Sequence, residues 1–201
     1  MKKTFWDIWA PLYDFFERRN GDSYRKMVKA VIDLTPEGAR VFEAACGTAA
    51  IGIGVSKKAE SVLCTDISEN MLKVAAEKIR KQGIKNVTIS KRSIYETGEP
   101  DGAFDTVIAA QVLHLLDDPK KAADELYRIT SARLILPLAL TKSLSGTSKF
   151  LITLYKLVGF SPKLEFDHED YKRFIKSLGF ENVKYIKIKG NIAITIAVIV
   201  K

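Results

Sequence analysis

Hydrophobic and polar positions follow two alternating periods through the middle of the chain. Short apolar runs, typical of buried strands, are separated by segments whose apolar residues recur every three or four positions, as in helices. The predicted strands are residues 40–43, 61–65, 86–91, 104–110 and 133–138. The predicted helices between them are residues 49–57, 68–81 and 118–129. Strands that alternate with helices at this interval predict parallel βαβ units.

The two ends of the chain have different patterns. Apolar residues recur with a helical period over residues 5–16 and again after Asp22, which we expect to cap a second helix. Helical stripes also cover residues 147–158 and the segment after Asp167, which Gly179 ends. These segments add helices outside the βαβ units.

The end of the chain predicts a β-hairpin. Residues 182–189 and 192–200 both have the apolar pattern of strands. The pair Gly190-Asn191 between them is typical of a tight two-residue turn. An antiparallel hairpin would therefore close an otherwise parallel sheet.

Composition narrows the class of protein. The chain has 201 residues, of which 47% are hydrophobic. Its most apolar stretch, Ile192 to Val200, is shorter than the roughly 20 residues that a transmembrane helix needs. Cys46 and Cys64 form no Cys-x-x-Cys pair and no His/Cys cluster, so we expect neither a disulfide framework nor a metal site. We expect a cytoplasmic protein without a transmembrane segment.

The net charge of +8 is concentrated at the two ends of the chain. Residues 142–201 carry 11 Lys and Arg against five Asp and Glu, whereas residues 30–141 carry 14 against 15. The excess fits a solvated Lys-rich surface, and it also fits attraction to an anionic substrate or a membrane surface. No Arg-rich run or aromatic-basic motif indicates a nucleic-acid partner.

The candidate site follows the first predicted strand. The segment Val41–Ala49 joins an acidic strand end, Glu43, to a loop of small residues that opens a helix. Small side chains let a ligand approach the backbone, and N–H groups at the helix start can bind it. Asp66 ends the next strand 19 residues after Gly47, where a carboxylate can accept hydrogen bonds from both hydroxyls of a ribose. This pattern alone fits both a nicotinamide dinucleotide and S-adenosylmethionine.

Three segments together resemble the class I S-adenosylmethionine-dependent methyltransferases, in the small-molecule branch that includes the ubiquinone/menaquinone methyltransferases. They are Val41–Ala49, Leu63–Leu72 and Phe104–Pro119, and the closing hairpin is similar to the reversed last strands of that fold. The resemblance implies S-adenosylmethionine as cofactor and S-adenosylhomocysteine as product. It also implies a small-molecule or lipid-like acceptor.

The pattern and the resemblance predict the same fold class. We expect an α/β fold: a Rossmann-like three-layer sandwich around a mostly parallel seven-stranded sheet, with an antiparallel C-terminal hairpin and an N-terminal helical cap. A single methyltransferase domain would occupy residues 1–201. Its parts would be a helical cap at 1–38, a cofactor-binding core at 39–138, a lid with helices at 139–179 and the terminal hairpin at 180–201.

The resemblance implies which residues hold the adenosine part of the cofactor. The backbone of Ala45, Cys46 and Gly47 would approach its ribose and methionine parts, and Asp66 would hold the ribose hydroxyls. The residues expected beside the adenine are Ile67, Met71, Ser93 and Ile94.

Other residues would surround the methionine part of the cofactor. Glu43 would lie under its amino-acid end, and Gln111 would present a backbone carbonyl to its ammonium group. Tyr13 resembles an N-terminal tyrosine that folds over the cofactor. If the acceptor must lose a proton, His114 is the first candidate for a general base, ahead of Tyr13 and Tyr24.

The sequence departs from the family pattern at three places. Ala45 and Ala49 replace glycines, so a positive φ would be strained at residue 45, whereas mere closeness to the ligand would tolerate a methyl group. Ser93 replaces the usual acidic residue of the adenine loop. Thr130-Ser131 replaces a Gly-Gly turn before the fifth strand.

Three classes of function stay open on the sequence. The first is methyl transfer to a small molecule or lipid. The second is a non-catalytic protein that binds the cofactor or a partner on the same fold, which the replaced glycines suggest. The third is a nicotinamide-dependent oxidoreductase, although the chain lacks the third motif glycine and a catalytic Tyr-x-x-x-Lys.

Overall fold

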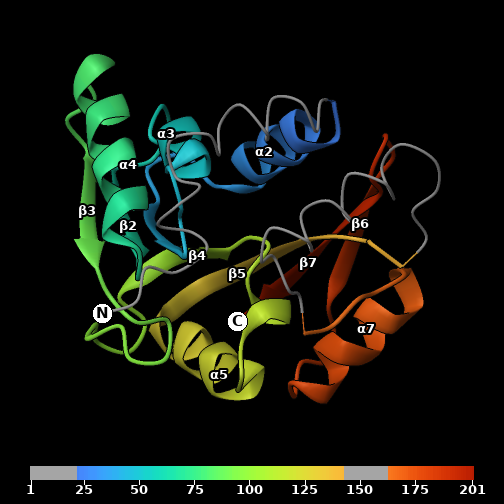
Figure 1. Cartoon of the computed structure of the whole chain (residues 1–201). Helices are drawn as coiled ribbons and strands as arrows, with labels where there is room; N and C mark the ends of the chain where they lie inside the picture. Colours follow the sequence, from blue (N-terminus) through green and yellow to red (C-terminus); the bar gives the residue numbers. More distant parts are fainter. Residues whose placement is uncertain (1–21, 143–162) are drawn as a thin grey trace.

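A computed structural model describes residues 22–142 and 163–201 of the chain around one central sheet (Figure 1). The sheet has seven strands in the order β3-β2-β1-β4-β5-β7-β6. The strands are β1 Arg40–Ala44, β2 Ser61–Asp66, β3 Val87–Lys91, β4 Phe104–Ala109, β5 Thr130–Ala139, β6 Lys184–Ile188 and β7 Ile194–Val200. Strands β1 to β5 are parallel, and β7 runs antiparallel to both of its neighbours. The predicted α/β fold with a closing antiparallel pair is confirmed.

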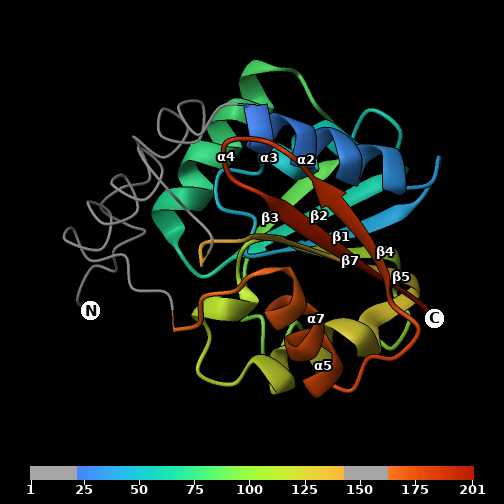
Figure 2. The ribbon, with the colours of Figure 1, turned by 90° about the vertical axis from the view of Figure 1, so that its right-hand side faces the viewer.

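Helices cover both faces of the sheet and complete three layers (Figure 2). One face carries α2 Asp22–Leu34, α3 Ala50–Val55 and α4 Glu69–Lys81, and the other carries α5 Pro119–Ile129 and α7 His168–Ser177. A short 3-10 helix, η1 Leu113–Leu115, follows β4. Each helical layer encloses its own apolar cluster against the sheet. Strands buried on both faces explain the continuous apolar runs in the sequence.

Polar side chains start three of the helices. The Ser68 hydroxyl accepts a hydrogen bond from the Met71 amide at 3.2 Å, which starts α4. The Asp118 carboxylate accepts one from the Lys121 amide at 2.9 Å, and proline is the first residue of α5. Asp167 starts α7 in a reciprocal capping box. Asp22, which we expected to cap α2, is instead its first residue and pairs with Lys26.

The tight turn predicted at Gly190-Asn191 is wrong. Residues 189–193 connect β6 to β7, and Gly190 does not have a positive φ. A Cβ at Gly190 would lie 2.2 Å from the Ser23 hydroxyl oxygen, which also accepts a hydrogen bond from the Ile192 amide at 3.1 Å. Gly190 is therefore explained by the close approach of the hairpin to α2 and not by turn geometry.

The fifth strand begins earlier than predicted. Thr130 and Ser131 are the first two residues of β5 and do not form a turn. The Thr130 hydroxyl donates to the Leu126 carbonyl at 2.7 Å, which satisfies the end of α5 and lets the chain pass directly into the strand.

The strand order creates a topological switch point between two inner strands of the sheet, β1 and β4. The chain winds outward from β1 through β2 to β3, and then returns to β4 on the other side of β1. The carboxyl ends of β1 and β4 therefore flank a topological switch point, where open α/β sheets bind ligands.

Two predicted helices, at residues 5–16 and 147–158, lie outside the described residues, as does Tyr13. Among residues 22–142 and 163–201, no helix is both long enough and apolar enough to cross a lipid bilayer.

Candidate functional site

The loop after β1 has an alternating backbone conformation. Ala45, Gly47 and Ala49 all have positive φ angles, of 49°, 54° and 57°. This left-handed region costs a residue with a Cβ roughly 1–2 kcal/mol, whereas glycine enters it freely. The two glycine replacements therefore fall at positions that need a positive φ, and both alanines are strained. The loop amides donate within the protein: Cys46 to the Thr65 carbonyl, Gly47 to the Asp66 carboxylate and Ala49 to the Cys46 carbonyl.

Asp66 joins this loop to the end of β2. One of its carboxylate oxygens accepts a hydrogen bond from the Gly47 amide at 2.9 Å, and the other accepts one from the Ser68 amide at 2.8 Å. The side chain is buried, with 9% of its surface exposed. The carboxylate predicted to bind a ribose thus lies directly against the glycine at the centre of the loop.

Glu43 lies beneath the loop. Its Oε2 accepts hydrogen bonds from the Gly52 amide at 2.8 Å and from the Cys64 thiol at 3.3 Å. Burial raises the pKa of Glu43 to about 7. These contacts tie the start of α3 to β1 and β2, so the carboxylate supports the loop from the protein side.

The thiols of Cys46, in the loop, and Cys64, in β2, are neighbours. Both are buried as free thiols, and the Cys46 amide donates to the Thr65 carbonyl at 2.9 Å. A hydrogen bond with Cys46, burial and the nearby Glu43 carboxylate all raise the pKa of Cys64 well above its ordinary value. A thiol with a raised pKa is a poor nucleophile, so packing explains these cysteines.

Gly52 is a site residue that the sequence analysis missed. A Cβ at this position would lie 2.3 Å from the Cys64 sulfur and 2.7 Å from Oε2 of Glu43. Gly52 is therefore required for α3 to approach the buried carboxylate. The signal in the sequence was the pair of glycines in the short helical segment Ala50–Val55, where glycine is unfavourable without a packing reason.

The residues predicted beside the adenine differ in exposure. Ile67 follows Asp66 and is 67% exposed, whereas the side chain of Met71 is buried. An exposed apolar side chain beside the carboxylate predicted to bind a ribose would suit the face of a purine. Ser93 is exposed and its hydroxyl accepts a hydrogen bond from the Tyr95 amide at 3.2 Å, while Ile94 packs against the apolar core.

Gln111 follows the end of β4 across the switch point from the loop. Its φ is 57°, a third left-handed conformation at a residue other than glycine near this edge of the sheet. Its backbone amide donates to the Pro137 carbonyl of β5 at 3.0 Å. The structure thus places Gln111 with Asp66 and the loop at the carboxyl ends of neighbouring strands.

His114 lies in η1 and is buried. Burial lowers its pKa to about 4, so the imidazole is neutral at pH 7. Its Nδ1 has no hydrogen-bond partner among the described residues. The His114 carbonyl accepts hydrogen bonds from the amides of Lys163 and Leu164 at 3.1 and 3.3 Å, which fixes the segment before α7 against η1.

The part of the chain that the structure describes holds no group of three or more His, Cys, Asp or Glu side chains that could bind a metal ion. The chemistry that the described site can supply is therefore that of two buried carboxylates, a neutral imidazole and backbone amides.

Comparison with known proteins agrees with this geometry. Residues 41–132 match a family model described as a methyltransferase domain. The match covers a little less than half of the chain. The matched range contains every site residue discussed above, from Glu43 to His114. The resemblance seen in the sequence is confirmed.

Proteins similar in sequence to this chain include methyltransferases with different acceptors in their names. The chain is 30% identical over 124 residues to a phosphatidylethanolamine N-methyltransferase of Cereibacter sphaeroides, which covers 60% of the chain and 58% of that enzyme. It is 26% identical over 180 residues to a ubiquinone/menaquinone biosynthesis C-methyltransferase of Edwardsiella ictaluri, with 78% of the chain and 72% of the relative covered. The chain thus spans little more than half the length of the first of these enzymes.

A solved structure shows the same fold over nearly the whole chain. An S-adenosylmethionine-dependent methyltransferase from Thermotoga maritima superimposes with a TM-score of 0.73 at 21% sequence identity. The match covers 98% of this chain and 99% of that one. At this identity the likeness establishes the fold alone.

Proposed function

We propose that the protein binds S-adenosylmethionine at the carboxyl ends of β1, β2 and β4 and transfers its methyl group to a small-molecule or lipid-like acceptor. The observation that carries this proposal is the arrangement around Asp66. Its carboxylate lies against the Gly47 amide, and the exposed Ile67 side chain follows it. A ribose and a purine need these two neighbouring features, and the family match is to methyltransferases.

The residues present fit this cofactor. The loop at residues 45–49 carries no side chain larger than Cys46 and Thr48, both of which are buried, so its backbone can be approached closely. The Asp66 carboxyl oxygens accept from the Gly47 and Ser68 amides, and oxygen acceptors of this kind suit the hydroxyl donors of a ribose. All the residues named as contacts of the cofactor stay predictions: Tyr13, Glu43, Ala45, Cys46, Gly47, Asp66, Ile67, Met71, Ser93, Ile94 and Gln111.

Methyl transfer asks mainly for alignment. The cofactor supplies an activated methyl group on a sulfonium. The protein has to hold the acceptor in line with that group and keep water away. Such positioning can lower the activation barrier by about 7–11 kcal/mol. The strained backbones at Ala45 and Gln111 suit this task because they fix the site before the cofactor binds.

We propose that His114 contacts the acceptor. A buried polar atom without a partner costs free energy, so its retention indicates a ligand group that the imidazole can bind. Because His114 is neutral at pH 7, its ring can accept a hydrogen bond from a hydroxyl or amine of the acceptor. If His114→Asn left turnover unchanged while S-adenosylhomocysteine still bound, this role would be wrong.

Apolar side chains near η1 suggest the kind of acceptor. Leu164 is 39% exposed, and its amide donates to the His114 carbonyl of η1. The ring centroids of Phe166 and Phe174 lie 4.9 Å apart in the segment that follows. A phosphatidylethanolamine methyltransferase and a quinone methyltransferase among the relatives both have lipid-like acceptors by name. We therefore infer a hydrophobic acceptor for this chain.

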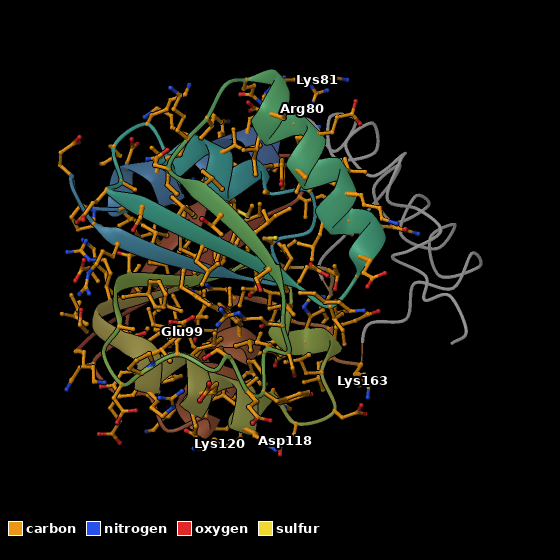
Figure 3. The ribbon with its side chains drawn as sticks, turned by 90° about the vertical axis from the view of Figure 1, so that its left-hand side faces the viewer. Arg80, Lys81, Glu99, Asp118, Lys120 and Lys163 are labelled. Carbon is orange, nitrogen blue, oxygen red and sulfur yellow. The ribbon has the colours of Figure 1, made fainter. Side chains whose placement is uncertain are left out.

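The surface charge is dispersed. Figure 3 shows Arg80 and Lys81 at one end of the view and Lys120 and Lys163 near the other. The three lysines are each paired with a carboxylate, of Glu77, Asp124 and Asp117 respectively. These pairs favour a solvated surface over a single anion-binding patch, so peripheral contact with a membrane stays a prediction from net charge.

We also propose a cytoplasmic location for the protein, which its two free cysteines fit.

A labelled-methyl experiment tests this function. The protein is incubated with S-adenosylmethionine labelled in its methyl group and with separate lipid, small-molecule, protein and nucleic-acid fractions of a cell extract. We expect label in the lipid or small-molecule fraction, loss of transfer in Asp66→Asn, and normal transfer in Asp33→Asn, an exposed carboxylate on α2. Label confined to protein or nucleic acid would contradict the acceptor class.

Both rival functions predict that no fraction is labelled, and the binding of adenosyl ligands separates one rival from the other. A non-catalytic binding protein would bind the cofactor and label no fraction. A nicotinamide-dependent oxidoreductase would bind neither adenosyl ligand. The match to a methyltransferase family model favours neither rival.

A further inference from the structure

The side chain of Gln111 makes contacts that its predicted backbone role does not require. Its Oε1 accepts a hydrogen bond from the Ala139 amide at 2.9 Å, and its Nε2 donates to the sulfur of Met27 at 3.5 Å. Ala139 is the last residue of β5, and Met27 is fully buried in α2. One amide side chain therefore joins the ends of β4 and β5 to a helix on the face of the sheet.

Pro137 explains why the side chain is used in this way. Proline has no N–H group, so β5 offers only its carbonyl to the backbone of residue 111. The next amide that β5 presents at this edge, that of Ala139, is taken by the side chain of Gln111. These contacts hold a left-handed conformation that residues with a Cβ rarely adopt.

The two partners of Gln111 belong to different layers of the molecule. Ala139 ends a strand of the sheet, whereas Met27 lies in the apolar cluster between the sheet and its helices. A change in the position of α2 relative to β5 would therefore be transmitted through Gln111 to the end of β4.

We propose that Gln111 is a positioning residue whose amide side chain fixes α2 to the end of β5 and so couples cofactor binding at the end of β4 to the position of α2. The proposal rests on the proposed function, because it assigns the methionine end of the cofactor to the backbone of residue 111. It adds a structural link from that point to α2.

The test combines calorimetry with amide hydrogen exchange. Gln111→Met keeps the length of the side chain and removes both amide contacts, while Gln111→Glu keeps the acceptor for Ala139 and removes the donor to Met27. Gln82→Met, at the exposed end of α4, is the matched control. Each protein is titrated with S-adenosylhomocysteine, and exchange is followed in α2 and, as an internal reference, in β3.

We expect S-adenosylhomocysteine to slow exchange in α2 of the wild type. In Gln111→Met the Kd should rise about fivefold, the factor for one neutral hydrogen bond, and the protection of α2 should be lost while β3 is unchanged. Gln111→Glu should fall between the two, and Gln82→Met should match the wild type. Wild-type protection of α2 in ligand-bound Gln111→Met would overturn the proposal.

Two further outcomes keep this test decisive. If Gln111→Met fails to fold, Met27→Leu replaces it, because leucine preserves the volume and removes the sulfur acceptor; unchanged α2 protection in that variant would overturn the proposal. If the wild type does not bind S-adenosylhomocysteine, the proposed function fails. Exchange in the ligand-free proteins then decides the link between α2 and β5, which unchanged α2 exchange in Gln111→Met would exclude.

Discussion

At the scale of single residues, the site is built from strained backbone positions. Ala45 and Ala49 adopt a conformation that favours glycine, and Gln111 does so with a long side chain. Such strain persists only where other contacts compensate. Here the Gly47 amide donates to Asp66, and the Ala139 amide of β5 donates to the side chain of Gln111. Removing it should therefore change stability in a predictable direction.

Substituting Ala45→Gly should stabilise the fold. Relief of the left-handed alanine contributes roughly 1–2 kcal/mol, and the greater freedom of glycine in the unfolded chain offsets about 0.5–1 kcal/mol. Chemical denaturation should show a free energy of unfolding higher by up to about 1 kcal/mol. Ala76→Gly on the exposed face of α4 is the control and should lower it by about 1 kcal/mol. A loss of stability in Ala45→Gly would contradict the strain.

Glu43 should make stability depend on pH. Its pKa is about 7 in the folded protein against an ordinary value of 4.5, so the folded state holds a proton that the unfolded state has released. The free energy of unfolding should therefore fall as pH rises from about 4.5 to about 7, by about 3 kcal/mol, and level off above.

Glu43→Gln should remove this dependence because the amide does not titrate. The advantage of the variant over the wild type, measured by denaturation, should be larger at pH 8 than at pH 5. Equal differences at the two pH values would show that Glu43 does not carry a raised pKa.

At the scale of elements, the packing of α3 depends more on Gly52 than on Gly54. Gly52→Ala would place a methyl group 2.3 Å from the Cys64 sulfur, whereas Gly54→Ala would meet the flexible end of Ile32 at 2.7 Å. We expect Gly52→Ala to lower the free energy of unfolding by about 1–3 kcal/mol and Gly54→Ala to lower it less. The paired thermal unfolding curves would refute this packing if Gly54→Ala were the more harmful change.

The sequence predicted those elements whose signals are local. The helices starting at Ser68 and Asp118 follow from caps and apolar period within a few residues, and their starts agree with the structure. The tight turn predicted at Gly190 was wrong because the residue that requires this glycine, Ser23, is far away in the sequence. Only a three-dimensional contact distinguishes a glycine needed for closeness from one needed for a turn.

The parts of the candidate site that depend on local sequence spacing could be predicted, and those that depend on distant contacts could not. Asp66 and Gly47 follow a spacing that the sequence displays, and the structure joins them by a hydrogen bond. The side-chain contacts of Gln111 link residues of α2, β4 and β5 that no sequence period relates. The burial of His114 likewise depends on how the segment before α7 returns to η1.

At the scale of the whole molecule, the strand order brings the loop after β1, Asp66 and Gln111 to one edge of the sheet at its switch point. Ligand binding there should stabilise the entire fold. A ligand at 100 times its Kd adds about 2.7 kcal/mol to the free energy of unfolding. This binding free energy would exceed the roughly 1–2 kcal/mol by which one alanine with a positive φ destabilises the loop.

Calorimetric titration of the wild-type protein with S-adenosylmethionine, S-adenosylhomocysteine and NAD tests the central claim most directly. The account predicts saturable binding of both adenosyl ligands at one site per chain and no binding of NAD. Binding of NAD together with failure of both adenosyl ligands would contradict it.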